Sequence, residues 1–304
     1  MTDIEYRIHW LNFTVHAPNE DAFTLYDLLF KETFGELEAK GHGGRSFKEI
    51  YHALSEVKLY LNPAMGNGQY FHFEIPGQAC DALSWEHYRA LGELLEGNQK
   101  GNHKFTRLDI AFDNVPFSPE QVEQAIKAGE LRSLAKRETL AVHASPFEKR
   151  ENGEIGTYTV ELGSRTSERM IRVYNKRGFI RLEFETKEKR ANLIAGQLFR
   201  VFDTSHWQAV MLSHLRDYVD FHPAWWAEFT EGSFRAWQTI SSPKEISQEK
   251  LMRWFDKQVS PALSVLHDTM PEYAMKAILD RGRRRRGARY DLLLNAHQKA
   301  GNDG

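Results

Sequence analysis

Cysteine is almost absent from this chain, whose 304 residues include only Cys80. A disulfide framework within the chain is therefore impossible, and so is a zinc site built from several cysteines. Long apolar runs are missing too, because no stretch approaches the ~18 consecutive apolar residues of a membrane-spanning helix. The opening residues, MTDIEYRIHW, lack a basic region followed by an apolar run, so we expect no signal peptide. These absences predict a soluble cytoplasmic protein with no membrane partner.

An excess of charge of either sign is also missing. The chain has 40 basic and 42 acidic residues, for a net charge of −2. Its 41% hydrophobic and 12% aromatic content is enough for a sizeable core and one or two domains. A surface for nucleic acid would therefore have to be local.

Several catalytic motifs are absent. No two of the 13 histidines are separated by one residue, which excludes the His-hydrophobic-His metal site of one large class of nicking enzymes. The sequence contains no P-loop, no His-Glu-x-x-His and no Gly-x-Ser-x-Gly. The missing motifs argue against an enzyme that hydrolyses ATP at a P-loop and against a hydrolase with a serine nucleophile.

Strand patterns dominate the first two thirds of the chain. They cover residues 10–15, 57–61, 70–75, 107–113, 139–143, 157–162, 170–176 and 179–187. Helical patterns follow the N-cap Ser118 and span residues 188–203, and after about residue 205 they replace the strands. We predict an α+β fold with a largely antiparallel, curved sheet and flanking helices, followed by a helical C-terminal region. The expected domains are residues 1–205 and 206–304.

The segment RLDIAFD at residues 107–113 alternates regularly. As a strand it places Arg107, Asp109 and Asp113 on one face and its apolar residues on the other. A hard cation could bind either or both carboxylates. The pattern is equally typical of a solvated strand face with ordinary charges.

A predicted hairpin at residues 170–187 carries a tyrosine among cations. Arg172, Tyr174 and Lys176 share one face of its first strand. On the second strand, one face carries Arg181, Glu183, Glu185 and Lys187. A nucleophilic tyrosine that cleaves a phosphodiester needs cations for the phosphate and an acceptor for the phenol proton. The same spacing is typical of a cross-strand ladder of salt bridges around a half-buried tyrosine.

The sequence has one strongly basic run, at residues 281–289. It holds six arginines, among them Arg283, Arg284, Arg285 and Arg286. Such a run can neutralise several phosphates and give salt-dependent affinity for DNA, and we favour that interpretation over a solvated tail.

Several of these segments stand in an order typical of one family. They cover residues 9–14, 73–80, 107–113, 163–165 with 171–176, 181–183 and 253–259. Together they resemble the Rep_trans-type plasmid and phage replication initiators, the replication initiation factor family. Its members include rolling-circle plasmid initiators, filamentous-phage replication proteins and some conjugative-element relaxases. Pro76 and Asp81 depart from the family pattern, which affects the expected local DNA contacts rather than the chemistry.

The resemblance implies metal-dependent nicking of origin DNA with Tyr174 as nucleophile, a 5′-phosphotyrosine intermediate and a free 3′-OH. Its ligands for Mg²⁺ or Mn²⁺ would be Asp109, Asp113 and Glu183, with Glu185 in reserve. We expect these groups within several ångströms of one another and of Tyr174. The phosphate would be held by Arg172, Lys176 and Arg181, and DNA also by Arg107 and the arginine run.

Two alternatives remain open at this stage. A relaxase that starts conjugative transfer would use the same chemistry with different partners. A DNA-binding regulator could keep the fold without cleavage, although the intact Tyr174 argues against such a loss. Candidate partners besides origin DNA, which would be recognised double-stranded and cleaved single-stranded, are a host helicase and a second copy of the chain.

Overall fold

The protein divides into two compact units, Met1–Ala236 and Trp237–Gly304. The structure is a computed structural model that describes residues 3–65, 68–98, 102–149, 155–176, 178–200, 205–231, 255, 260–271, 274, 276 and 280. No helix within these described residues is long and apolar enough to cross a membrane. The first unit contains the sheet and the candidate site.

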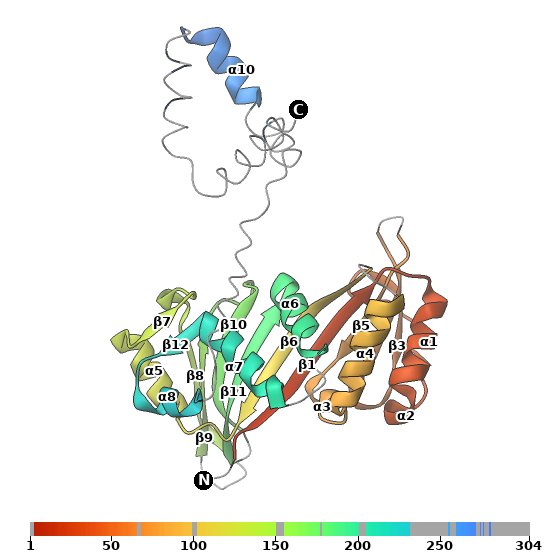
Figure 1. Ribbon diagram of the computed structural model, residues 1–304, viewed down its shortest axis with the longest axis horizontal. Helices are drawn as coiled ribbons and strands as arrows, with labels where there is room; N and C mark the ends of the chain where they lie inside the picture. Colours follow the sequence, from red (N-terminus) through yellow and green to blue (C-terminus); the bar gives the residue numbers. More distant parts are fainter. Residues whose placement is uncertain are drawn as a thin grey trace, which may run out of the picture. The chain divides into compact units, whose positions relative to one another are not determined.

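A ten-stranded sheet organises the first unit (Figure 1). In spatial order its strands are β2 (Glu38–Ala39), β3 (Phe47–His52), β4 (Lys58–Pro63), β5 (Phe71–Ile75), β1 (Glu5–Val15), β6 (His103–Asp113), β11 (Phe179–Lys187), β10 (Arg169–Lys176), β9 (Ile155–Leu162) and β8 (Ala141–Lys149). Neighbouring strands all pair antiparallel. The predicted α+β fold with a largely antiparallel sheet and flanking helices is confirmed.

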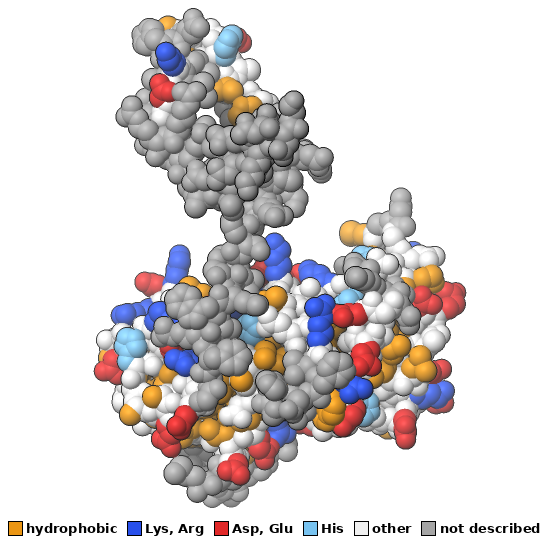
Figure 2. Space-filling view, in the orientation of Figure 1, with side chains coloured by type: hydrophobic (Ala, Val, Ile, Leu, Met, Phe, Trp, Pro, Cys, Tyr) orange, Lys and Arg blue, Asp and Glu red, His pale blue; other side chains and the backbone are white. Residues whose placement is uncertain are grey.

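Helices lie across one face of this sheet, with α4, α6 and α7 in front of the strands in Figure 1. The first unit contains α1 (Asn19–Leu29), α2 (Lys31–Phe34), α3 (Gly77–Cys80), α4 (Trp85–Asn98), α5 (Pro119–Ala128), α6 (Glu188–Leu198), α7 (Ser205–Tyr218) and α8 (Ala224–Phe229). The space-filling view shows apolar side chains between charged ones over these helices (Figure 2). The helices bury the apolar residues of the strands beneath them.

The central strands separate apolar from polar side chains. On β6, Leu108, Ile110 and Phe112 are fully buried and belong to the apolar core. The alternate residues Asp109 and Asp113 lie on the opposite face, because successive side chains of a strand point to opposite sides. The predicted alternation on this strand is confirmed, and the polar face is the one that carries the candidate site.

Aromatic pairs join neighbouring strands to one another and to the helices. Phe13 on β1 stacks against Phe73 on β5, with ring centroids 5.0 Å apart. Phe105 on β6 meets Phe199, which follows α6, edge to face at 5.2 Å. Such contacts add to the burial of large apolar rings and fix the central strands against the helical layer.

Helix α5 begins as the sequence predicts. The side chain of Ser118 accepts a hydrogen bond from the backbone of Gln121, and the Gln121 side chain accepts one from the backbone of Ser118. This capping box satisfies two backbone donors that a helix start leaves unpaired. The helix ends at Gly129, whose φ of 78° is in the left-handed region that favours glycine.

The first unit extends beyond the boundary expected at residue 205. Trp207 on α7 donates a hydrogen bond to the carbonyl of Leu198 at the end of α6. β12 (Val219–Phe221) pairs with β7 (Leu131–Ser133) in a separate two-stranded sheet, and Trp226 on α8 is buried beside Phe117. The helices after residue 205 therefore complete the core of this unit. In the second unit the structure describes α10 (Ser260–Thr269).

Candidate active site

Tyr174 lies on β10, directly opposite Arg181 on β11. Its hydroxyl donates a hydrogen bond to Oε1 of Glu183 at 2.6 Å. Burial raises the pKa of Tyr174 well above its usual value, and the negative charge of Glu183 raises it further, while Arg181 lowers it. The phenol is therefore protonated at neutral pH, with a carboxylate in place to accept its proton.

His9 also contacts Glu183, because β1 is irregular at this point. The register between β1 and β6 shifts between Ile8 and Trp10, so His9 is an extra residue in a β-bulge. Nδ1 of His9 lies 3.3 Å from Oε1 of Glu183. Burial lowers the pKa of His9, with Arg181 and Lys176 lowering it further and Glu183 opposing them. His9 is therefore neutral at neutral pH, and Glu183 connects it with Tyr174.

Arg181 is buried, with 2% of its side chain exposed. Its Nη2 donates to Oδ2 of Asp113 at 2.7 Å, and its Nε contacts the other carboxylate oxygen. Nη1 lies 3.8 Å from Glu183 Oε1 and has no hydrogen-bond partner. A buried guanidinium with an unused donor next to Tyr174 suits a phosphate oxygen.

Arg172 lies among three glutamates on the same face. Its Nη2 is 3.5 Å from Glu183 and 3.6 Å from Glu185, and its Nε is 3.7 Å from Glu161 on β9. The Nε is buried and makes no hydrogen bond. Lys176 follows at the end of β10, where burial and then Arg181 lower its pKa. Arg172, Lys176 and Arg181 thus lie around Tyr174, and their role toward a phosphate stays a prediction.

A second acidic group lies around Arg107. Its Nη2 donates to Asp109 at 2.6 Å and to Glu185 at 3.1 Å, and its guanidinium lies 4.4 Å from the ring centre of Trp10. Burial raises the pKa of Asp109 to about 7, although Arg107 opposes the shift. Burial alone would raise the pKa of Glu185, but Lys187, Arg107 and Arg172 lower it below its usual value.

The three carboxylates expected to hold the metal, Asp109, Asp113 and Glu183, have different partners in the structure, and their metal role stays a prediction. Asp109 and Asp113 are four residues apart on β6, which separates their backbones by ~13 Å at the usual rise of a strand. Glu183 lies opposite Ala111, between them, while Asp113 is held by Arg181 and Arg7. Among the described residues, no three His, Cys, Asp or Glu side chains are already arranged to hold a metal ion.

Comparison with known proteins shows to which family the chain belongs. Residues 103–280, more than half of the chain, match the family model described as Replication initiation factor. The chain belongs to the replication initiation factor family. Its fold is similar to that of the rolling circle replication initiator protein from Geobacillus stearothermophilus, with a TM-score of 0.56 and 19% identity over 72% of this chain and 87% of that chain. No curated protein sequence matches the present chain.

Three residues that contact the charged groups of the site, Glu161, Arg7 and His9, are not predicted from the sequence. Glu161 shares a face with Thr157 and Thr159, an alternation that could have revealed it. Arg7 and His9 could not be found in this way, because only the fold brings Arg7 to Asp113 and only the bulge gives His9 its place.

The predicted DNA-binding residues have different outcomes. Arg107 lies on the polar face and is engaged by two carboxylates of the protein. Arg283, Arg284, Arg285 and Arg286 lie outside the described residues. Their contact with DNA stays a prediction.

Proposed function

We propose that this replication initiation factor starts rolling-circle replication of a plasmid or phage by nicking one strand of its origin DNA. The Tyr174 hydroxyl oxygen attacks a phosphodiester phosphorus and passes its proton to Glu183. The bond from phosphorus to the 3′ oxygen breaks, and the departing oxygen takes a proton from water, which leaves a 5′-phosphotyrosine and a free 3′-OH. A polymerase can extend that end.

The observation that carries this proposal is the hydrogen bond from Tyr174 to Glu183. A phenol has an unperturbed pKa of ~10 and needs a base to attack at neutral pH. Glu183 is such an acceptor at 2.6 Å. The neutral His9 lies 3.3 Å from the same carboxylate oxygen, so the imidazole is next to the atom that receives the proton.

Arginines beside this pair suit the charge of the reacting phosphate. Nη1 of Arg181 and Nε of Arg172 are buried donors without hydrogen bonds. Buried polar groups normally find a partner, and a phosphate offers charged oxygens to each donor. Donors positioned before the reaction stabilise the extra negative charge of the transition state. Lys176 extends the same basic surface at the end of β10.

Three acidic side chains suit a divalent cation. Asp109 and Glu185 share Nη2 of Arg107, and Glu185 shares Nη2 of Arg172 with Glu183. Oxygen-only donors fit Mg²⁺ or Mn²⁺. A bound ion would draw charge from a phosphate oxygen. We therefore assign the metal role to Asp109, Glu183 and Glu185, and Asp113 positions Arg181.

A nicking assay on supercoiled DNA tests the proposal. The substrate carries the region upstream of the gene and is incubated with and without Mg²⁺. We expect wild-type protein to convert it to open circles only with the metal, and Tyr174→Phe to bind DNA without nicking. Tyr158→Phe is the matched control, because Tyr158 on β9 bonds Glu123 away from the site. Nicking by Tyr174→Phe at the wild-type rate would overturn the proposal.

A further inference from the structure

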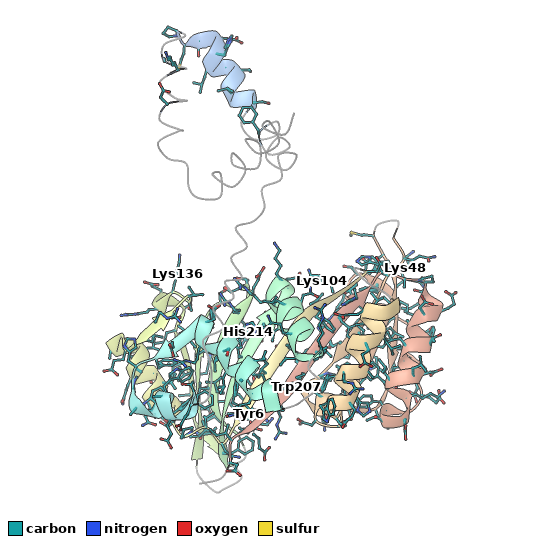
Figure 3. The ribbon with its side chains drawn as sticks, viewed as in Figure 1. Tyr6, Lys48, Lys104, Lys136, Trp207 and His214 are labelled. Carbon is teal, nitrogen blue, oxygen red and sulfur yellow. The ribbon has the colours of Figure 1, made fainter. Side chains whose placement is uncertain are left out.

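A pocket of about 390 Å³ lies beside the first half of β1. β5 pairs with β1 only from Leu11 to Val15, and α3 begins where β5 has ended. Parts of β1, α4 and α7 close the pocket, and its aromatic lining comes from Tyr6, Trp85, Tyr88 and Trp207. Figure 3 shows Trp207 on α7 near Tyr6 at the start of β1. The pocket therefore lies beside the part of β1 that β5 leaves unpaired.

The aromatic walls are held in place by the protein's own contacts. Trp207 donates its indole N–H to Leu198, and Tyr88 donates to the carbonyl of Cys80 at 3.3 Å. The rings of Tyr88 and Trp207 are 5.8 Å apart. Trp85 is half-buried at the start of α4, with Arg89 5.5 Å from its ring centre. These rings form a rigid surface against which a flat ligand can stack.

Arg7 connects the pocket with the candidate active site. It lines the pocket, and its Nη1 lies 3.2 Å from Asp81 at the same wall. Its Nε lies 3.2 Å from Asp113, the carboxylate that holds Arg181 opposite Tyr174. A chain of ion pairs therefore runs from Asp81 at the pocket through Arg7 and Asp113 to Arg181 beside Tyr174.

We propose that the pocket receives one unpaired base of the single-stranded DNA beside the scissile phosphate, an inference that rests on the proposed function. The base stacks on the aromatic walls, as bases do in proteins that bind single strands. The Asp81 carboxylate, 40% exposed, accepts a hydrogen bond from an amino group on the edge of the base. Adenine, cytosine and guanine carry such a group, whereas thymine offers only its N3–H between two carbonyl oxygens that a carboxylate repels, so the pocket disfavours thymine.

Binding of homopolymeric oligonucleotides to the full chain, without divalent metal, tests the proposal. The probes are fluorescein-labelled oligo(dA), oligo(dC) and oligo(dT), and the readout is anisotropy. We expect Trp85→Ala to weaken oligo(dA) and oligo(dC) binding about tenfold, the usual scale for one lost stacking contact. Trp85→Phe keeps a ring and should restore most of the affinity. Trp225→Ala on α8, outside the pocket lining, is the matched control and should bind as wild type does.

The base preference gives a second readout that loss of folding cannot imitate. Asp81→Ala should bind oligo(dA) and oligo(dC) no better than wild type binds oligo(dT), and its own oligo(dT) affinity should be unchanged. Equal affinity of the wild type for all three probes, or an effect of Trp225→Ala as large as that of Trp85→Ala, would overturn the pocket assignment. Failure of the pocket assignment can be told from failure of the proposed function. The pocket is tested by binding of oligonucleotides without metal, whereas nicking by Tyr174 is measured on supercoiled DNA with other variants.

Discussion

The hydroxyl of Tyr174 and the carboxylate of Glu183 come from neighbouring strands and meet in a hydrogen bond of 2.6 Å. Arg172, not Tyr174, is the direct register partner of Glu183. The tyrosine reaches the glutamate diagonally across β10 and β11, and this leaves Arg181 opposite the tyrosine. One pair of strands thus places a nucleophile, a base and a cation together.

Glu183→Gln removes the proposed base and keeps the shape of the side chain. We expect the nicking rate to fall ~100-fold or more, which is the usual range for a lost general base. Binding of DNA should be retained. The measurement is single-turnover nicking on the supercoiled substrate.

The control for this variant is Glu123→Gln, because Glu123 also accepts a hydrogen bond from a tyrosine, Tyr158, outside the site. It should nick at the wild-type rate. A Glu183→Gln rate within a few-fold of wild type would remove Glu183 from the proton transfer.

The two aspartates of β6 should respond differently to metal. Asp109→Asn and Glu185→Gln should raise the Mg²⁺ concentration needed for half-maximal nicking, and excess Mn²⁺ should partly restore activity. Asp113→Asn should instead lower the free energy of unfolding, because it loosens a buried ion pair with Arg181. Metal titration of nicking and urea unfolding separate these effects. An equal shift of the metal midpoint in Asp113→Asn would restore Asp113 as a ligand.

His214 gives a pH dependence of stability away from the site. Burial lowers its pKa from 6.5 to about 4, and its Nε2 lies 2.6 Å from Oε1 of Gln197 (Figure 3). The unfolded chain takes up a proton near pH 6.5 and the folded chain only near pH 4. The unfolding free energy therefore falls as the pH drops through this window, by at most about 3 kcal/mol for this group.

His214→Gln should reduce that loss when urea unfolding is compared at about pH 7 and about pH 4.5. Burial also lowers the pKa of His72 to about 4, so part of the pH dependence of the unfolding free energy remains in this variant. The exposed His267 supplies a control, and His267→Gln should retain the full wild-type slope. If the unfolding free energy of His214→Gln falls between these two pH values as much as that of the wild type, the role assigned to the buried His214 ring is wrong.

Local patterns predicted much of the fold and part of the site. Alternation predicted which residues share a face within each of β6, β10 and β11, because the period of a strand is fixed by its backbone. The proximity of Asp109 and Glu183 to Tyr174 was implied only by the family resemblance. Ser118 marked the start of α5. The bulge at His9 breaks the period and left no readable pattern. Alternation also could not show that Arg7 and Arg181 would hold Asp113, since these contacts join distant segments.

The arginine run should contribute salt-dependent affinity. Replacing Arg283, Arg284, Arg285 and Arg286 by alanine should weaken origin and random DNA equally, because phosphate contacts carry no direct sequence information. Each lost contact should reduce the log–log salt slope by ~0.9 on duplex DNA or ~0.7 on single strands. Titrations at several salt concentrations measure the slope. An unchanged slope would mean that the run is a solvated tail.

Trapping the covalent intermediate tests the central claim most directly. A single-stranded substrate that spans the nick is incubated with protein and Mg²⁺, denatured, digested with trypsin and analysed by mass spectrometry. The account predicts a DNA fragment joined through its 5′ phosphate to the peptide that contains Tyr174, and no adduct with Tyr174→Phe. An adduct on another residue, or an equal yield from Tyr174→Phe, would contradict it.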